Sequence, residues 1–193
     1  MTNYLASAAI AALALAASPA AAQTAPSPSG ARVEAVLGYD ALRVDLEDYG
    51  IDEKLKDNDL FYGIGAGFDF AVSPGLSAGV DVEASESRNR YDFDDGEENI
   101  EITTGRDLYA GGRLTLPVSN AANVYAKAGY TNLQIKGDSA GVEDSTTLDG
   151  YRVGAGAQFR IAGNAYVGGE YRFSDYEEDV SRHQIAMTLG TRF

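Results

Sequence analysis

Few side chains in this sequence have the types and spacing of a catalytic group, and the clearest set lies near residue 183. His183 is the only histidine, and Ser181 stands two positions before it; both follow the acidic residues Glu177, Glu178 and Asp179. A serine and a histidine at i and i+2 share one face of a strand, as a nucleophile and its general base require. A set confined to one strand edge is not by itself a triad. We therefore favour His183 as an interfacial residue.

A second set of candidate ligands is an acidic run in the middle of the chain. Its members surround Gly96 and are Asp92, Asp94, Asp95, Glu97 and Glu98. Hard cations prefer oxygen ligands of this kind. An EF-hand loop centred on Gly96 would place Tyr91 at its first ligand position, so the spacing does not fit that motif. We interpret the run as solvated charge. Cysteine is absent, which excludes thiolate metal sites, and we expect no cofactor.

The largest set of chemically capable residues recurs at every second position of several segments. These charged residues are Glu34, Asp40, Asp69, Asp81, Glu83, Asp107, Arg113, Lys127, Arg152, Arg160, Glu170, Arg172, Arg182 and Arg192. Glycines are interleaved with them, and the alternate positions carry uncharged residues such as Val80 and Val82. A period of two indicates strands with one polar and one apolar face. Acids dominate the first half of the set and bases the second, so closing the sheet would bring them together.

The alternation divides the chain into eight strand-like segments. They lie near residues 31–42, 61–70, 76–86, 104–116, 123–133, 151–161, 166–173 and 184–193. Most have about 10 to 13 residues, the length a tilted strand needs to cross a bilayer and longer than the usual strand of a globular protein. We predict an all-β fold, an eight-stranded antiparallel up-and-down transmembrane β-barrel. Its uncharged face would contact lipid, and its charged face would line the lumen.

The connections between these segments alternate in length and charge. Those at 71–75, 117–122 and 162–164 are short. Those near 43–59, 86–103, 134–149 and 174–181 are long and hold 22 of the 29 acidic residues. This alternation is typical of outer-membrane barrels, with short turns in the periplasm and long loops outside. A soluble sandwich or lipocalin-like barrel also alternates, but its apolar face points inward.

Two features of the predicted barrel concern its lumen and its rims. An eight-stranded barrel is only wide enough inside for side chains, so an ion-paired plug is favoured over a narrow ion path. The inward glycines would leave space for water or for long arginine side chains. On the outer face, tyrosines near the strand ends suit interfacial girdles; they are Tyr39, Tyr62, Tyr130, Tyr151 and Tyr171.

The N-terminal segment predicts export. Residues 5–17 form an apolar run, a Ser-Pro pair breaks it, and three alanines precede Gln23. We interpret residues 1–22 as a signal peptide and the Pro/Ser-rich residues 23–30 as a flexible lead-in. Residues 31–193 would form the barrel domain. The formal net charge of −14 argues against binding to nucleic acid.

Three stretches resemble a known family. GGEYRFSDY (Gly168–Tyr176) and RHQIAMTLGTRF (Arg182–Phe193) resemble the last hairpin of small porin-like barrels, the opacity-protein and OmpA-like surface antigens of alphaproteobacteria. GIGAGFDFAVSPGLSAGVDVEAS (Gly63–Ser85) resembles their second and third strands. The C-terminal pattern resembles the signal read by the barrel-assembly machinery; its residues are Ile185, Met187, Leu189, Thr191 and Phe193. The resemblance implies outer-membrane lipids, lipopolysaccharide and periplasmic chaperones as partners, and a monomer in a Gram-negative outer membrane.

These observations leave three functional hypotheses. The leading one is a non-enzymatic surface barrel that supports the envelope and makes exterior contacts through acidic loops. The second is a narrow porin-like channel for ions or small solutes. The third is an outer-membrane lipid A acyl hydrolase, since some small barrels of that kind use a histidine with a serine and an acid at the exterior edge.

Overall fold

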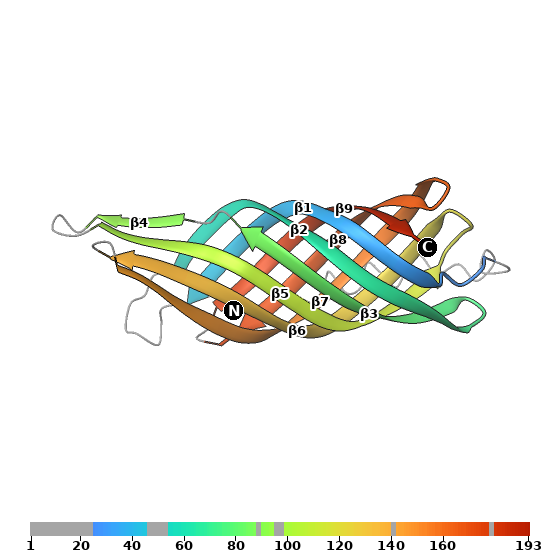
Figure 1. Cartoon of the computed structure of the whole chain (residues 1–193), viewed down its shortest axis with the longest axis horizontal. Coiled ribbons are helices and arrows are strands. Elements are labelled where there is room, and N and C mark those ends of the chain that lie inside the picture. Colours follow the sequence, from blue (N-terminus) through green and yellow to red (C-terminus); the bar gives the residue numbers. More distant parts are fainter. Residues whose placement is uncertain (1–24, 46–53, 88–89, 95–98, 140–141, 178–179) are drawn as a thin grey trace, which may run out of the picture.

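The computed structural model describes residues 25–45, 54–87, 90–94, 99–139, 142–177 and 180–193 and forms a closed antiparallel β-barrel (Figure 1). The predicted signal peptide lies outside these residues. The strands are β1 (Gly30–Asp45), β2 (Lys54–Ser73), β3 (Leu76–Ser87), β4 (Arg90–Asp94), β5 (Asn99–Pro117), β6 (Ala122–Ser139), β7 (Val142–Ala162), β8 (Ala165–Tyr176) and β9 (Val180–Arg192).

The wall of the barrel has eight strands, as predicted, because β4 continues the line of β3. Both pair with β5: Glu86 of β3 lies opposite Arg106, and Arg90 of β4 lies opposite Thr103. The other neighbours follow the chain as hairpins, and β1 pairs with β9. The β3–β5 pairing therefore closes the wall, so that each wall strand has a hydrogen-bonded neighbour on both sides.

Several strands are longer than the sequence predicted. β2 begins at Lys54, β6 reaches Ser139 and β7 begins at Val142, so most of the predicted long loops are hairpin extensions of the barrel. The β6–β7 ladder continues through Lys136↔Ser145 to Ser139↔Val142. Continued pairing satisfies backbone N–H and C=O groups beyond the apolar band, which a loop would leave to water. We call this end of the barrel the long-hairpin end.

The opposite end carries the short turns at 74–75, 118–121 and 163–164 and is called the short-turn end (Figure 1). Gly75 and Gly163 have φ values of 83° and 50° there, which a residue with a side chain adopts at a cost. The lead-in is tied to this end. The Ser27 hydroxyl donates to the Ser73 carbonyl over 2.8 Å, and Ser77 donates to the Pro28 carbonyl over 2.5 Å. Residues 25–29, expected to be flexible, are thus held against the β2–β3 turn.

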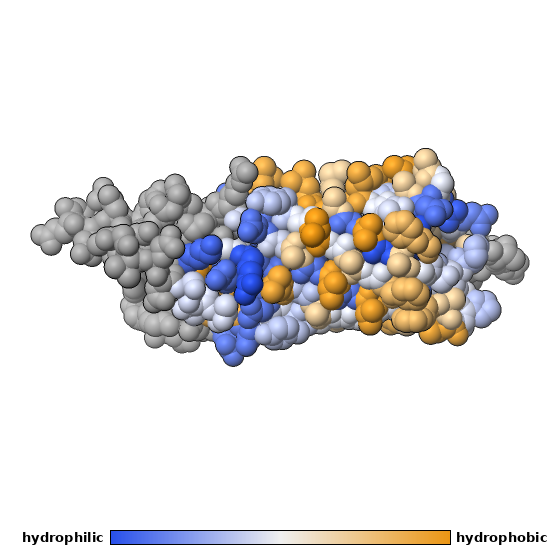
Figure 2. Space-filling view, viewed as in Figure 1, coloured by the Kyte–Doolittle hydropathy of each residue, from blue (hydrophilic) through white to orange (hydrophobic). Residues whose placement is uncertain are grey.

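Large apolar side chains cover the outer face of the barrel wall (Figure 2). Ile64 and Met187 are each 71 % exposed, and the five tyrosines predicted to face outward are all about half exposed. Hydrophilic residues gather toward the long-hairpin end in the same view. This arrangement inverts that of a soluble barrel and requires apolar surroundings for the wall. Among the described residues, no helix is long and apolar enough to cross a membrane.

Candidate functional site in the barrel lumen

The lumen is filled by ion pairs in three connected layers, the first of which lies toward the long-hairpin end and centres on Asp107. Its Oδ2 atom accepts hydrogen bonds from Arg152 Nη2 at 2.5 Å, Arg182 Nη1 at 2.9 Å and the Tyr176 hydroxyl at 3.0 Å. Its Oδ1 atom accepts from Thr131 at 2.7 Å. Arg182 also pairs with Asp40, which lies on the neighbouring strand β1. Asp107 is 1 % exposed, so these donors replace its hydration.

The central layer crosses the lumen. Arg172 of β8 pairs with Glu83 of β3, which lies on the opposite wall. Lys127 Nζ lies 2.8 Å from Glu170 Oε1 and 3.6 Å from Glu83 Oε2. Arg172 Nε lies 2.8 Å from the same Glu170 oxygen. Strands β3, β6 and β8 are therefore joined through side chains as well as through the backbone.

The third layer lies toward the short-turn end. Arg32 pairs with Asp81, and its Nε donates to Asp69 Oδ2 over 3.0 Å. Arg113 Nη1 lies 3.7 Å from Glu34 Oε1. Arg32, which the alternation allows as an additional inward base, is 2 % exposed.

Thirteen of the fourteen predicted lumen residues lie in these layers, and Arg160 does not. Arg160 is exposed at the rim of the short-turn end, next to an irregularity in the β7–β8 pairing. Arg160 is two positions after Gln158 and so points to the same side of the strand, but the wall ends before the Arg160 side chain is enclosed.

The three layers hold equal numbers of acidic and basic side chains. The seven carboxylates belong to residues 34, 40, 69, 81, 83, 107 and 170, and the seven cations to residues 32, 113, 127, 152, 172, 182 and 192. The sequence predicted that acids of the first four strand segments would meet bases of the last four. The Glu83–Arg172 and Asp107–Arg182 pairs are of this kind, but other pairs join two residues from the same half of the chain.

Aromatic side chains fill the lumen beside the charges, and the charge pattern did not reveal them. Several stand opposite an inward glycine on the paired strand: Phe61 opposite Gly38, Tyr125 opposite Gly156, Tyr166 opposite Gly190 and Tyr176 opposite Gly150. A Cβ at Gly156 would lie 2.6 Å from the Tyr125 ring. Arg113 also stacks on Tyr125, 3.5 Å from the ring centre. An aromatic residue at an inward-facing position, with a glycine opposite it on the paired strand, is the sequence signal that would have identified these rings.

An apolar cluster lies inside the barrel at the long-hairpin end. Leu133, Leu148, Tyr176 and Val180 are at most 6 % exposed and pack together, with Ile135 against them. We call these five residues the apolar cap. Leu148, Tyr176, Val180 and Ile135 fall in segments predicted to be acidic loops. Because those segments continue as paired strands, their inward positions remain inside the barrel and bury apolar surface.

His183 lies on the outer face and not in the lumen. Its Nδ1 atom is 2.7 Å from the Tyr171 hydroxyl, and its ring centre is 5.0 Å from that of Phe173. Ser181 is partly exposed two positions away on the same strand. Glu178, Asp179 and the acidic run at 95–98 lie outside the described residues. Within the described part of the chain, no group of three or more histidines or carboxylates is arranged to hold a metal ion.

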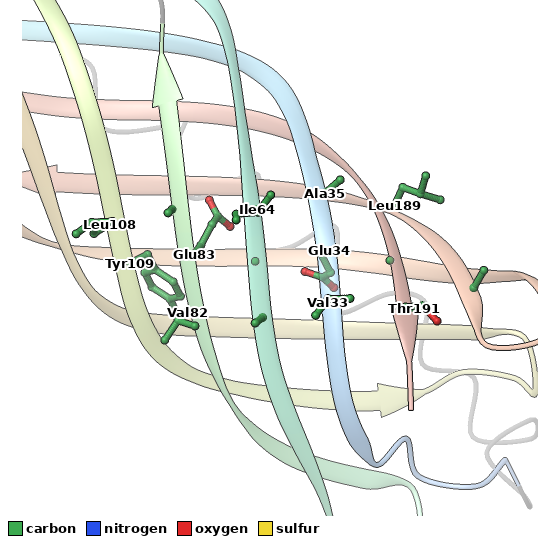
Figure 3. Close-up of a pocket in the computed structure, with 15 residues that line it drawn as sticks. Val33, Glu34, Ala35, Ile64, Val82, Glu83, Leu108, Tyr109, Leu189 and Thr191 are labelled. Atoms are coloured by element: carbon green, nitrogen blue, oxygen red, sulfur yellow. The ribbon is translucent and has the colours of Figure 1, made fainter.

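A groove of about 980 Å³ lies on the outer face of the wall (Figure 3). It crosses strands β9, β1, β2, β3 and β5, where Ala35, Ala66 and Ala84 are flanked by larger residues such as Ile64 and Leu189. The small side chains lower the surface between the large ones. The groove therefore lies in the apolar wall, and the inward-facing residues Glu34, Glu83 and Tyr109 also border it.

The sequence matches the family described as outer membrane protein beta-barrel domain over residues 8–193. The chain belongs to this family of outer-membrane β-barrels. The family assignment explains the exposed apolar wall, and it agrees with the resemblance to small OmpA-like surface barrels seen in three stretches of the sequence.

Solved structures with this fold include other small outer-membrane barrels. The attachment invasion locus protein Ail of Yersinia pestis is 17 % identical, with a TM-score of 0.57 over 86 % of this chain and 100 % of that one. Neisserial surface protein A is 15 % identical, with a TM-score of 0.62 over 86 % and 98 %. The N-terminal barrel of Pseudomonas aeruginosa OprF is 10 % identical, with a TM-score of 0.51 over 86 % and 100 %. No curated protein matches the sequence. At these identities the likeness shows the fold alone.

Proposed function

We propose that this outer-membrane barrel is a non-enzymatic structural and surface protein with a lumen that does not conduct. Its role would be to contribute a stable wall element to the envelope of a Gram-negative bacterium and to present its long hairpins for contacts outside the cell. The proposal keeps the barrel monomeric, with lipids and lipopolysaccharide around its wall.

The single observation that carries this proposal is the filled lumen. The Glu83–Arg172 pair crosses the barrel between opposite strands, and Lys127 and Arg152 also approach Glu83, at 3.6 Å and 3.7 Å. A permeating ion would have to separate charges that are buried and paired, which costs about several kcal/mol because a buried charge would lose its partner. The apolar cap adds a second barrier at the long-hairpin end.

The orientation in this proposal follows the family pattern of short periplasmic turns and longer exterior connections. The short-turn end, with residues 25–29 and Phe193, would face the periplasm. The long-hairpin end would then carry most of the acidic residues to the cell surface. The exposed alternate residues from Ile185 to Phe193 would be read by the barrel-assembly machinery during insertion.

Planar-bilayer recording of the refolded protein tests the role. We expect no unitary current steps, with insertion verified by the faster migration of the folded form on unheated detergent gels. The control is a refolded general porin inserted in the same bilayer. Regular current steps from this barrel would overturn the structural role and favour the channel.

A lipid A deacylation assay tests the non-enzymatic part of the proposal. The His183 ring contacts Tyr171 and Phe173, which suits an aromatic residue at the lipid interface. We expect no release of acyl chains by the wild-type protein. Turnover that is lost in the His183→Ala variant would instead identify an acyl hydrolase.

A further inference from the structure

A polar pocket of about 320 Å³ occupies the lumen mouth at the short-turn end. The lead-in (residues 26–29) forms one wall. The β5–β6 turn, the end of β7 with the β7–β8 turn, the start of β8 and the end of β9 form the others. Arg160, Arg192, Gln158, Asn123 and Tyr166 contribute polar groups to it. The pocket is thus built from five separate parts of the chain and is lined by side chains that hydrogen-bond.

Two guanidinium groups in this pocket have unused donors. Arg160 forms no ion pair or side-chain hydrogen bond with any described residue. Arg192 Nη2 lies 3.0 Å from Asp69 Oδ2, but its N–H bonds do not point at that oxygen, and neither terminal nitrogen of Arg192 has a hydrogen-bond acceptor in the described part of the chain. Because Asp69 also accepts from Arg32, it cannot satisfy Arg192 fully. Both cations can therefore receive an oxyanion.

Gln158 places an unpartnered hydrogen-bond acceptor, its amide oxygen, at the same pocket. Its side chain is 1 % exposed, and its Nε2 atom donates to Glu34 Oε1 over 2.9 Å. Its Oε1 atom is buried and has no donor among the described residues. The nearby Glu34 carboxylate is already engaged by Tyr166 at 2.7 Å and by Arg113 at 3.7 Å. The Arg192 guanidinium and the Gln158 amide oxygen therefore have no hydrogen-bond partner among the described residues, and a single ligand with an acceptor and a donor can serve both.

The charges of the three layers are balanced without Arg160. The layers hold seven carboxylates and seven cations, and Arg160 lies outside them at the pocket, which the terminal residue Phe193 also lines. The ion-pair layers lie beyond the pocket, and the apolar cap lies at the far end of the lumen. With the lumen plugged as proposed above, a bound molecule would enter and leave at the short-turn end.

We infer that this mouth is a binding pocket for a small carboxylate that also carries an N–H donor, the chemistry of a peptide C-terminus. The carboxylate lies between Arg160 and Arg192, where charge-assisted hydrogen bonds hold it. The N–H group donates to Gln158 Oε1. In the orientation proposed above, the pocket takes this ligand from the periplasm; the binding itself does not depend on that orientation.

The test is a titration of the refolded, ¹⁵N-labelled barrel in detergent micelles, followed through the backbone amides of Gly163 and Asn164, which line the pocket. The probes are N-acetylglycine, which has both groups, acetate, which lacks the N–H, and N-methylacetamide, which lacks the carboxylate. We expect saturable shifts with N-acetylglycine. Acetate should bind about tenfold more weakly, because it lacks the N–H that donates to the buried Gln158 Oε1. N-methylacetamide should give no saturable shift, because it lacks the carboxylate and its charge-assisted hydrogen bonds.

Two matched variants complete the test. Arg160→Gln should raise the dissociation constant for N-acetylglycine by about tenfold or more. Arg106→Gln, which removes an exposed arginine on the outer face near the other end, should leave it unchanged. No saturable shift in the wild-type protein, or equal affinity in the two variants, would overturn the inference. A conducting barrel that still binds N-acetylglycine would refute the proposed role and leave the pocket standing.

Discussion

Arg172 on β8 and Glu83 on β3 meet across the lumen although 89 residues separate them in the sequence. The pair joins opposite walls of the barrel, and neither partner is exposed by more than 8 %. A contact of this kind cannot form until the sheet has closed, so it reports the complete barrel and not any single hairpin.

Replacement of Glu83 by Gln should destabilise the barrel strongly. The substitution removes the charge that faces Arg172, Lys127 and Arg152 and leaves buried cations short of a partner, which typically costs about 3–5 kcal/mol. Urea unfolding in lipid vesicles measures the change. Glu86→Gln is the matched control, because Glu86 lies on the same strand but is exposed on the outer face; it should change the free energy of unfolding by about 0.5 kcal/mol or less. Equal losses in the two variants would contradict a structural role for the central layer.

Gly156→Ala should destabilise the barrel by about 1–3 kcal/mol through overpacking. The new Cβ would lie 2.5 Å from the Gly169 carbonyl oxygen and 2.6 Å from the Tyr125 ring, and the backbone oxygen cannot move away as a side chain can. Gly169→Ala serves as the control, since a Cβ at Gly169 meets nothing within 4 Å. The midpoints of urea unfolding separate the two. A Gly156→Ala protein as stable as Gly169→Ala would show that Tyr125 does not need the space.

Leu148→Ala should weaken the apolar cap. Leu148 is 3 % exposed and packs with Leu133, Tyr176 and Val180, so its truncation should cost about 2–5 kcal/mol of local stability. Hydrogen exchange of the β7 and β9 amides at the long-hairpin end measures this local opening. Thr147→Ala, at the exposed neighbouring position, should leave the exchange rates unchanged. Similar protection in both variants would mean that the cap contributes little.

The lead-in should respond to the loss of a single hydroxyl. The Gly75 amide donates to Ser27 Oγ over 2.9 Å, so Ser27→Ala should speed exchange of that amide by about fivefold, the equivalent of about 1 kcal/mol. Ser29→Ala is the control, because Ser29 makes no side-chain hydrogen bond with any described residue. Unchanged exchange in Ser27→Ala would indicate that residues 25–29 are not held at the β2–β3 turn.

Much of the fold was predictable because a strand places its side chains with a period of two. Alternation alone assigned Asp107 to the inside and Leu189 to the outside, and the lengths of the segments indicated a membrane barrel. The same rule would have found Tyr125 and Tyr166, since each has inward parity and a glycine opposite. Strand ends were less predictable, because acidic composition at 134–149 suggested loops where backbone pairing in fact continues through Lys136 and Ser145.

The sequence by itself determined which face of the wall is charged, because the side-chain period of a strand is a local property. Only the tertiary structure decided which charges meet, because the stagger of the closed barrel sets the height of each strand against those across the lumen. That stagger brings Glu83 to Arg172 and Arg182 to Asp107. It also leaves Arg160 beyond the enclosed wall, at the mouth of the proposed carboxylate pocket, although its parity is that of a lumen residue.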